Sequence, residues 1–348
     1  MSEKKIVKFG VVGSSGMGKA HVEAMKRHTR MDVIAVCDKY RKDAEAVAEE
    51  YGVPMVFDDW HDLVKCDEID AVLVCVPDYL HAEITEAALA AGKDVICEKP
   101  MALTVEDCER MRNAEKKYGK RLMIGQICRH APGFKLAKEI IDRGDIGELY
   151  FVESEYAHDY SVARGLDDWR VDPRREPYIG GGCHAVDLLR WIAGDPYEVT
   201  AYSNHKCLTD WPVNDCTISI LRFPNDVIGK VFVSIGCKRN YTMRSCFYGT
   251  KGTIICNDAD PEITVFKTSL GNVDPLFGED GFSSQQLPIK VPVTVNTHNT
   301  YGELESFADC ILEDKPVPTT AYDGESTVVV CTSAMESAKT GKTVEIVY

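Results

Sequence analysis

The chain has 348 residues, of which 45% are hydrophobic and 27% are charged, and its formal net charge is −15. These proportions are typical of globular proteins and exclude a disordered, collagen-like or coiled-coil chain, and the length favours two domains. Because the chain is acidic and no apolar run approaches the roughly 20 residues of a membrane span, we expect neither nucleic acid nor a membrane as a partner.

Short runs rich in β-branched residues alternate with helical stretches through residues 1–125. Continuous apolar strands of this kind are buried on both faces, so the alternation predicts a doubly wound α/β domain with a parallel sheet. The expected strands are Lys5–Val12, Asp32–Cys37, Ala71–Val76, Asp94–Cys97 and Leu122–Ile124, and the expected helices are Gly18–His28, Ala44–Tyr51, His81–Ala91 and Thr104–Tyr118.

Residues 126–348 change to a period-two alternation with short turns, which predicts an antiparallel sheet in a second domain. One face of this sheet is expected to be exposed to solvent or covered by a partner. The expected strands are Tyr150–Tyr156, Val199–Asn204, Thr217–Phe223, Val227–Ile235, Ser245–Tyr248 and Gly252–Cys256, and the expected helices are Gly133–Arg143, Gly302–Glu313 and Gly324–Thr340.

A glycine-rich turn between the first strand and the first helix is the first candidate site. Such a turn brings backbone amides and a helix N-terminus to a pyrophosphate. The strict fingerprint would have a glycine at Ser15, whose small side chain still permits close approach. A purely structural glycine turn is the alternative. The expected cofactor-binding residues are Gly13, Ser14, Ser15, Gly16, Met17 and Gly18.

Asp38 ends the second strand, at the position where an acidic residue binds the adenosine ribose of a dinucleotide. A carboxylate there repels a 2′-phosphate, so we expect NAD rather than NADP, although Lys39 is adjacent and softens that preference. The alternative for Asp38 is a turn residue at the end of a strand.

Lys99 follows the fourth expected strand in the sequence Glu98-Lys99-Pro100. Doubly wound sheets bind ligands in the crevice at the carboxyl ends of their strands, so a lysine there is placed to move a proton. A surface lysine in a loop is the alternative.

Fourteen cysteines are spread from Cys37 to Cys331 without a CxxC pair. Zinc sites need clustered ligands, and disulfide scaffolds are small and secreted. We therefore expect reduced cysteines that pack as small hydrophobic side chains. The first residues lead into a strand-like segment without a signal-peptide core, which favours a cytoplasmic location.

Over nearly its whole length the chain resembles the glucose–fructose oxidoreductase/inositol dehydrogenase/MocA (Gfo/Idh/MocA) family of oxidoreductases. Besides the glycine turn, the resemblance is carried by Val76–His81, Glu98–Ala102, Gly144–Gly147, Trp169–Arg170, Gly181–Leu189 and Ser337–Gly341.

The resemblance implies an N-terminal Rossmann domain at 1–125 and a C-terminal α+β domain at 126–348, for substrate binding and oligomerisation, with a large, open, mostly antiparallel sheet. Such sheets commonly pair between subunits, so a homo-oligomer, a dimer or larger, is expected. In addition to the turn, Asp38 and Lys39, the resemblance implies cofactor contacts from Val76, Pro77, His81, Glu98, Lys99 and Arg170.

Lys99 matches the catalytic lysine of the family, and His184 matches its catalytic histidine. Many members have an aspartate four residues before that histidine, where this chain has Gly180. Either the glycines make room for a bulky substrate while Lys99 and His184 share the proton transfer, or Asp187, one helical turn after His184, replaces the missing carboxylate. A structural Asp187 that orients His184, and a buried core His184, are the alternatives.

The substrate pocket is expected to be lined by the second domain, where aromatic faces beside polar groups suit a sugar ring. Packing between the domains is the alternative for these side chains. The candidates are Arg129, His130, Tyr156, His158, Trp169 and Tyr178, together with Lys99 and His184.

Three functions compete. The first is an NAD-dependent dehydrogenase that oxidises a secondary hydroxyl of a sugar, sugar acid, cyclitol or glycoside, with Lys99 and His184 as acid–base groups and no metal. The second cleaves glycosides by transient ring oxidation and elimination, after which NADH returns the hydride. The third is a non-catalytic NAD(P)-binding metabolite sensor, against which the presence of both Lys99 and His184 argues.

Overall fold

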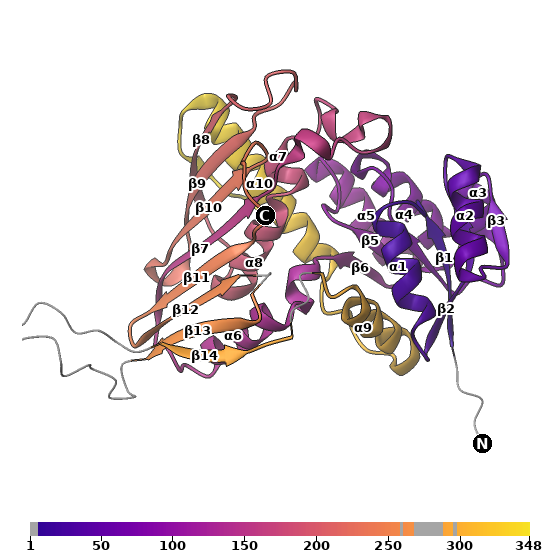
Figure 1. Cartoon of the computed structure of the whole chain (residues 1–348), viewed down its shortest axis with the longest axis horizontal. Helices are drawn as coiled ribbons and strands as arrows, with labels where there is room; N and C mark the ends of the chain where they lie inside the picture. Colours follow the sequence, from indigo (N-terminus) through magenta and orange to yellow (C-terminus); the bar gives the residue numbers. More distant parts are fainter. Residues whose placement is uncertain (1–5, 258–259, 268–287, 295–297) are drawn as a thin grey trace, which may run out of the picture. The chain divides into compact units, whose positions relative to one another are not determined.

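The computed structural model describes residues 6–257, 260–267, 288–294 and 298–348 of the chain. They fold into two compact units (Figure 1): the first comprises Met1–Ile127 and Asn299–Val328, and the second comprises Cys128–His298 and Val329–Tyr348. The expected ranges 1–125 and 126–348 place the first boundary closely, but they miss the return of residues 299–328 to the first unit. Short 3₁₀ helices lie at Asp78–Leu80, Ile127–His130, Tyr160–Val162, Leu166–Val171 and Pro224–Asp226.

The first unit contains a six-stranded parallel sheet with the strand order β3-β2-β1-β4-β5-β6. The order reverses between β1 and β4, and the carboxyl ends of the strands at such a point form the ligand crevice of doubly wound folds. The sequence pattern missed β3, which is short and only partly buried. The strands are β1 (Val7–Val12), β2 (Met31–Cys37), β3 (Met55–Phe57), β4 (Ala71–Val74), β5 (Asp94–Glu98) and β6 (Leu122–Gly125).

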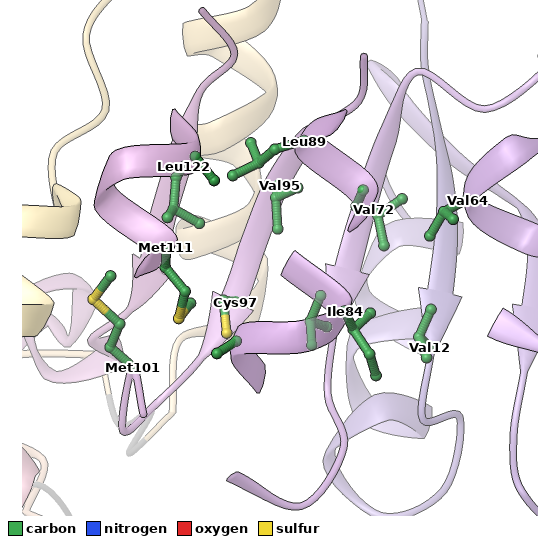
Figure 2. Packing of buried hydrophobic residues seen from close by; sticks show 14 of the residues in the cluster. Val12, Val64, Val72, Ile84, Leu89, Val95, Cys97, Met101, Met111 and Leu122 are labelled. Carbon is green, nitrogen blue, oxygen red and sulfur yellow. The ribbon is translucent and has the colours of Figure 1, made fainter. Parts of the chain in front are cut away.

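Helices cover both faces of this sheet, and each face has its own hydrophobic core. Figure 2 shows one of the cores, in which Val72 and Val95 of the sheet pack with Leu89 of α4 and Met111 of α5. The expected helix at 104–118 begins as its sequence indicates, because the Thr104 side chain accepts a hydrogen bond from the amide of Asp107. The helices are α1 (Met17–Lys26), α2 (Arg41–Tyr51), α3 (Trp60–Lys65), α4 (His81–Ala90) and α5 (Val105–Tyr118).

Helix α9 (Thr300–Glu313) belongs to the first unit, although it follows the whole second sheet in the chain. Its Phe307 ring lies 6.1 Å from the ring of Phe9 in β1. Nη2 of Arg30 lies 3.0 Å from Glu313 near the end of the helix. Sequence periodicity shows that α9 is amphipathic but does not identify the surface it covers, so the two continuous ranges missed this packing.

The second unit contains a nine-stranded mixed sheet with the strand order β14-β13-β12-β11-β7-β10-β9-β8-β15. Its strands pair antiparallel except β7 and β10, which run parallel. The sequence pattern missed β13, β14 and β15. The strands are β7 (Leu149–Ala157), β8 (Glu198–Asn204), β9 (Cys216–Arg222), β10 (Ile228–Ser234), β11 (Arg244–Gly249), β12 (Gly252–Asn257), β13 (Glu262–Lys267), β14 (Ile289–Pro292) and β15 (Val344–Glu345).

Helices pack against this sheet, with α6 on β12 and β13 and α8 on β7 and β10. Side chains alternate along β9, where Ile218 and Ile220 are exposed while their neighbours are buried. The sheet therefore has an exposed face that carries apolar side chains. The helices are α6 (Pro132–Asp142), α7 (Pro177–Gly180), α8 (Cys183–Ala193) and α10 (Ala321–Thr340), the last of which begins in the first unit and ends in the second.

Candidate active site

The glycine turn connects β1 to α1, and its conformation requires glycine at two positions. Gly13 has a φ of +87°, and a methyl group built on it would lie 2.1 Å from the carbonyl oxygen of Cys75. Gly16 has a φ of +53°, and apart from its chain neighbours no atom of the described residues lies within 4 Å of a methyl group built there. The turn is therefore packed tightly against the sheet at Gly13 and open at Gly16, where α1 begins.

Asp38 lies directly beside this turn. Its Oδ2 accepts hydrogen bonds from the amides of Ser14 (2.9 Å) and Ser15 (3.2 Å), and its Oδ1 accepts one from the amide of Tyr40 (3.1 Å). The carboxylate is buried, whereas the neighbouring Lys39 is exposed and its Nζ lies 5.3 Å from the centre of the Tyr40 ring. The end of β2 and the glycine turn thus form one hydrogen-bonded unit.

Glu98 and Lys99 lie at the carboxyl end of β5. Oε1 of Glu98 is 2.7 Å from Nε2 of the buried His21 in α1, and its Oε2 accepts a hydrogen bond from the amide of Lys99 (3.1 Å). Burial alone would raise the pKa of Glu98, but the hydrogen bond and charge of His21 and the charge of Lys99 outweigh it and lower the pKa to about 2. Glu98 is therefore a carboxylate beside the half-buried Lys99.

His81 ties the end of β4 to the segment after β5. Its Nε2 lies 3.0 Å from the carbonyl oxygen of Val76, and its Nδ1 lies 2.9 Å from the carbonyl oxygen of Pro100. Burial opposes the charged form, but the neighbouring Cys97 and Asp78 and the bond to Pro100 raise the pKa of His81 to about 9. Two carbonyl acceptors suit an imidazolium, which donates from both nitrogens. This histidine fixes the backbone on which Val76, Pro77 and Lys99 lie.

The ligand atoms of His21, Cys75 and Glu98 lie within 4.8 Å of one another, the spacing of a small metal site. However, the 2.7 Å between Nε2 of His21 and Oε1 of Glu98 is a hydrogen-bond distance. Burial and the charge of Glu98 also raise the pKa of the Cys75 thiol well above its usual value, which opposes the thiolate that a metal needs. We interpret the group as a hydrogen-bonded histidine–carboxylate pair beside a neutral thiol.

In the second unit, His184 lies in the first turn of α8 and is 2% exposed. The Tyr156 ring stacks on it with the ring centres 5.9 Å apart, and a methyl group built on Gly181 would lie 2.5 Å from that tyrosine ring. Nδ1 of His184 lies 3.6 Å from Sγ of Cys128. The glycine run before α8 therefore makes room for the aromatic ring that covers His184.

Asp187 is fully buried and forms a bidentate ion pair with Arg129. Nε and Nη2 of Arg129 donate to Oδ2 and Oδ1 of Asp187 over 2.8 and 2.7 Å. This geometry satisfies both carboxylate oxygens with one fixed guanidinium. It favours a structural role for Asp187 and also engages the arginine expected to bind substrate.

Of the other pocket candidates, Tyr156 and His158 lie together, whereas Trp169 and Tyr178 lie elsewhere in the second unit. The Tyr156 hydroxyl lies 2.8 Å from that of Tyr160 and 3.4 Å from Nδ1 of His158, so these side chains form a polar aromatic cluster with His184. His130 is mostly buried, and burial together with Lys135 and Arg129 lowers its pKa to about 4.

Trp169 and Tyr178 lie outside that cluster, whereas the guanidinium carbon of Arg170 lies 5.9 Å from the centre of the Tyr160 ring. The guanidinium carbon of Arg170 lies 4.5 Å from the centre of the Trp169 ring, and Nη1 of Arg170 donates to the carbonyl of Ala163 (3.4 Å). Tyr178 is buried, and its hydroxyl is hydrogen-bonded to Ser219 in β9. Tyr178 is thus part of the core of the second unit.

Sequence reasoning missed Tyr241 and His298, whose rings are stacked with their centres 5.9 Å apart. Tyr241 packs edge-on against Tyr156, and His298 lies 6.1 Å from His184. Both residues come from irregular segments, where periodicity carries no signal. In the sequence, only their residue types indicate them: an aromatic and an imidazole side chain in polar stretches.

Two comparisons with known families decide the classification. Residues 7–126 match the oxidoreductase family with an NAD-binding Rossmann fold, and residues 134–255 match the Gfo/Idh/MocA C-terminal domain. The chain belongs to the Gfo/Idh/MocA family of oxidoreductases. It is therefore an enzyme of the class expected, with an NAD-binding Rossmann domain followed by a mixed, mostly antiparallel sheet.

Relatives of the chain share this architecture. An inositol 2-dehydrogenase of Klebsiella pneumoniae subsp. pneumoniae is 30% identical over 254 residues, which are 71% of this chain and 72% of that protein. The crystal structure of a putative myo-inositol dehydrogenase from Sinorhizobium meliloti superposes with a TM-score of 0.82 at 25% identity and covers 98% of this chain and 100% of the other. A levoglucosan dehydrogenase, in complex with NADH and L-sorbose, gives a TM-score of 0.86 at 24% identity with 99% of both chains covered.

The residues at the crevice of the first unit fit a nicotinamide adenine dinucleotide. The open, positive-φ Gly16 at the start of α1 leaves room for a pyrophosphate, and Asp38 supplies a carboxylate at the end of β2. Among the described residues, no helix is long and apolar enough to cross a membrane.

Proposed function

We propose that this protein is an NAD-dependent dehydrogenase that oxidises a secondary hydroxyl of a sugar, cyclitol or glycoside. The observation that supports this most directly is the placement of Lys99, half-buried at the carboxyl end of β5 and next to the Glu98–His21 pair. The names of the relatives, inositol 2-dehydrogenase and levoglucosan dehydrogenase, support a polyhydroxylated ring as substrate.

The residues divide the work as follows. The start of α1 at the open Gly16 binds the pyrophosphate, while Asp38 holds the amides of Ser14 and Ser15 and accepts hydrogen bonds from the ribose hydroxyls. A carboxylate repels a 2′-phosphate, so this arrangement favours NAD over NADP. The bound cofactor supplies a hydride acceptor. Nζ of Lys99 takes the proton of the substrate hydroxyl, and Glu98, anchored by His21, fixes the backbone that carries this lysine.

In this proposal His184 is the second acid–base group, and its neighbours set its orientation. Stacking against Tyr156 and the contact between Nδ1 and the Cys128 thiol hold the His184 ring in place. The Tyr156, His158 and Tyr160 cluster beside it presents a ring face and hydroxyls to a sugar. Arg129 and Asp187 position this wall of the pocket and do not react.

The test is an assay of the purified protein with NAD and a panel of inositols, monosaccharides, sugar acids and aryl glycosides. NADH absorbance and product release are followed together. Net NADH formation on one class of substrate supports the proposal, whereas product release without net NADH indicates transient oxidation and elimination. Cofactor binding without turnover of any compound would favour a metabolite sensor and contradict the proposal.

A further inference from the structure

Glu303 is a buried carboxyl group that the proposed reaction does not use. It lies in the first turn of α9 and is 0% exposed. Neither of its carboxyl oxygens has a hydrogen-bond partner within the described part of the chain. Nor does it cap its own helix, because the Asn299 side chain accepts the hydrogen bond from the amide of Gly302 (3.1 Å). A buried carboxyl without hydrogen bonds is costly to ionise, and this one needs an explanation.

The side chain of Glu303 reaches the ligand crevice of the first unit. A methyl group built on Gly125, the last residue of β6, would lie 3.6 Å from Oε1 of Glu303 and 3.4 Å from Cα of Glu98. Gly125 and Glu98 are paired in the sheet. The carboxyl of Glu303 in α9 therefore lies over the end of β6, beside the end of β5.

The ionisable groups around Glu303 come from three further elements of the same unit. They are Glu98 and Lys99 at the end of β5, His21 of α1, which is bonded to Glu98, and Cys75 after β4. Burial and the negative charge of Glu98 raise the pKa of Glu303 well above its usual value, while the positive charge of Lys99 opposes that shift. This shift favours the protonated form of the carboxyl in the empty protein, and its affinity for the proton depends on the cations beside it.

We propose that Glu303 holds a proton in the empty protein and releases it to solvent when an oxidised nicotinamide ring binds beside Lys99. The inference rests on the proposed function for the position of that ring. An oxidised ring is a cation and stabilises the glutamate carboxylate as Lys99 does, whereas a reduced ring is neutral and leaves the proton in place. Binding of NAD thus converts the carboxylic acid of Glu303 to a carboxylate and frees one proton.

Proton release on binding makes NAD affinity depend on pH. The complex with NAD holds fewer protons than the empty protein, so its affinity rises with pH between the two pKa values of Glu303, by up to about tenfold per pH unit. The affinity for NADH has no such dependence on this group. Through this proton, Glu303 matches the charge of the crevice to the oxidation state of the cofactor.

The first experiment tests the proton in the empty protein by infrared spectroscopy. A protonated carboxylic acid has a C=O stretching band that a carboxylate lacks, and the difference between the natural protein and Glu303→Gln isolates this one group from other buried acids. We expect the band in the natural protein near neutral pH and its loss in the variant. A difference spectrum with only carboxylate bands would overturn the proposal, whether or not the protein binds a cofactor.

The second experiment measures proton release by titration calorimetry in two buffers of different protonation enthalpy. We expect the natural protein to release up to one proton with NAD and none with NADH, and Glu303→Gln to release none with either. Lys99→Met is the matched control, because it keeps Glu303 and removes the amine of Lys99 as a source of the proton. Since loss of the Lys99 charge raises the pKa of Glu303 further, this variant should release its proton with NAD at a higher pH than the natural protein does.

Two results would contradict the coupling. They are equal release by the natural protein and Glu303→Gln, and NAD affinity with the same pH dependence in the natural protein and Glu303→Gln. If Glu303→Gln does not fold, the natural protein alone provides the test. Equal proton release with NAD and NADH would then contradict the coupling. Failure to bind either cofactor would overturn the proposed function and the coupling together, while the infrared band would still report the proton on Glu303.

Discussion

The guanidinium of Arg175 occupies the space into which a side chain at Gly180 would project. A methyl group built on Gly180 would lie 2.3 Å from the guanidinium carbon and 2.5 Å from both terminal nitrogens. Arg175 is 3% exposed, its Nη2 donates to the carbonyl of Gly180 (3.2 Å), and its guanidinium lies 4.6 Å from the centre of the Trp169 ring. A buried arginine thus fills the position at which the family resemblance led us to look for an aspartate.

This contact makes Gly180→Ala a sensitive substitution. The added methyl group forces the guanidinium away from Trp169 and the Gly180 carbonyl, so we expect a loss of about 1–3 kcal/mol in the free energy of unfolding, measured in urea. In an Arg175→Ala background the same substitution should cost much less, because the space is then free. Equal costs in the two backgrounds would show that Arg175 is not the obstacle.

The Arg129–Asp187 ion pair gives a second prediction. Asp187→Asn keeps the shape of the side chain but leaves a buried guanidinium without its carboxylate, which typically costs about 3–5 kcal/mol. The double variant Arg129→Met/Asp187→Leu removes both charges and should recover much of that stability in urea unfolding. If Asp187 is structural, the double variant keeps its turnover within a few-fold of the natural protein. A loss of turnover without a loss of stability would instead assign the acid–base role to Asp187.

Those features of the site that depend on local sequence could be predicted. The glycine turn, Asp38 and Lys99 each follow a strand whose apolar run is visible in the sequence, and parallel strands bring such ends to one edge of the sheet. Their positions in the crevice follow from strand order, which the alternation of strands and helices already indicates.

What the sequence could not reveal depends on contacts between distant segments. Asp187 pairs with Arg129, which is 58 residues away in the sequence. Phe307 of α9 packs on Phe9, which lies near the other end of the chain. Glu303 appears in the sequence as one of many acidic residues on an amphipathic helix. Only its burial beside Gly125 distinguishes it, and burial is a property of the tertiary structure.

Cofactor preference tests the role of Asp38. Removal of its carboxylate by Asp38→Ala deletes a charge-assisted acceptor worth about 1.5–3 kcal/mol, so NAD affinity should fall roughly ten- to a hundredfold and the gap to NADP should narrow. Ser14→Ala is the control, because it loses only the long hydroxyl contact to Asp38 (3.4 Å). Fluorescence titration with both cofactors measures the effect. Equal affinities for NAD and NADP in the natural protein would contradict this prediction.

The exposed face of the second sheet leads us to expect a homo-oligomer. Ile218 of β9 pairs with Tyr202 of β8, and both side chains are exposed, as are Ile220 and Ile228 nearby. Apolar side chains gathered on one exposed face are typical of protein interfaces. Light scattering should therefore give a mass of two chains or more at micromolar concentration.

The double substitution Ile218→Lys/Ile220→Lys places two charges on this face and should dissociate the assembly without unfolding the chain. Val162→Lys is the matched control, because Val162 is an exposed apolar residue of the same unit that lies outside the sheet. A mass of one chain for the natural protein would contradict the assembly, and an unchanged mass for the double variant would place the interface elsewhere.

The last prediction concerns Lys99, on which the proposed reaction depends. Lys99→Met keeps the length and apolar contacts of the side chain and deletes the amine, while the Lys99 amide can still donate to Glu98. Folding and NAD affinity should therefore be preserved. Turnover should fall by about a hundredfold or more, which is the usual scale for the loss of a general acid or base.

Lys93→Met is a demanding control, because Lys93 immediately precedes the first residue of the same strand, β5. Its buried amine donates to the carbonyls of Cys66 and Ile69, so this variant should lose stability but keep its turnover.

His184→Ala should also slow the reaction, and the double variant with Lys99→Met should lose less than the product of the two single effects if both groups serve one proton path. Near-normal turnover by Lys99→Met would overturn the proposed mechanism, since no other lysine follows β5 at the crevice in the described part of the chain. It would also remove the main reason to prefer an active dehydrogenase over a cofactor-binding sensor.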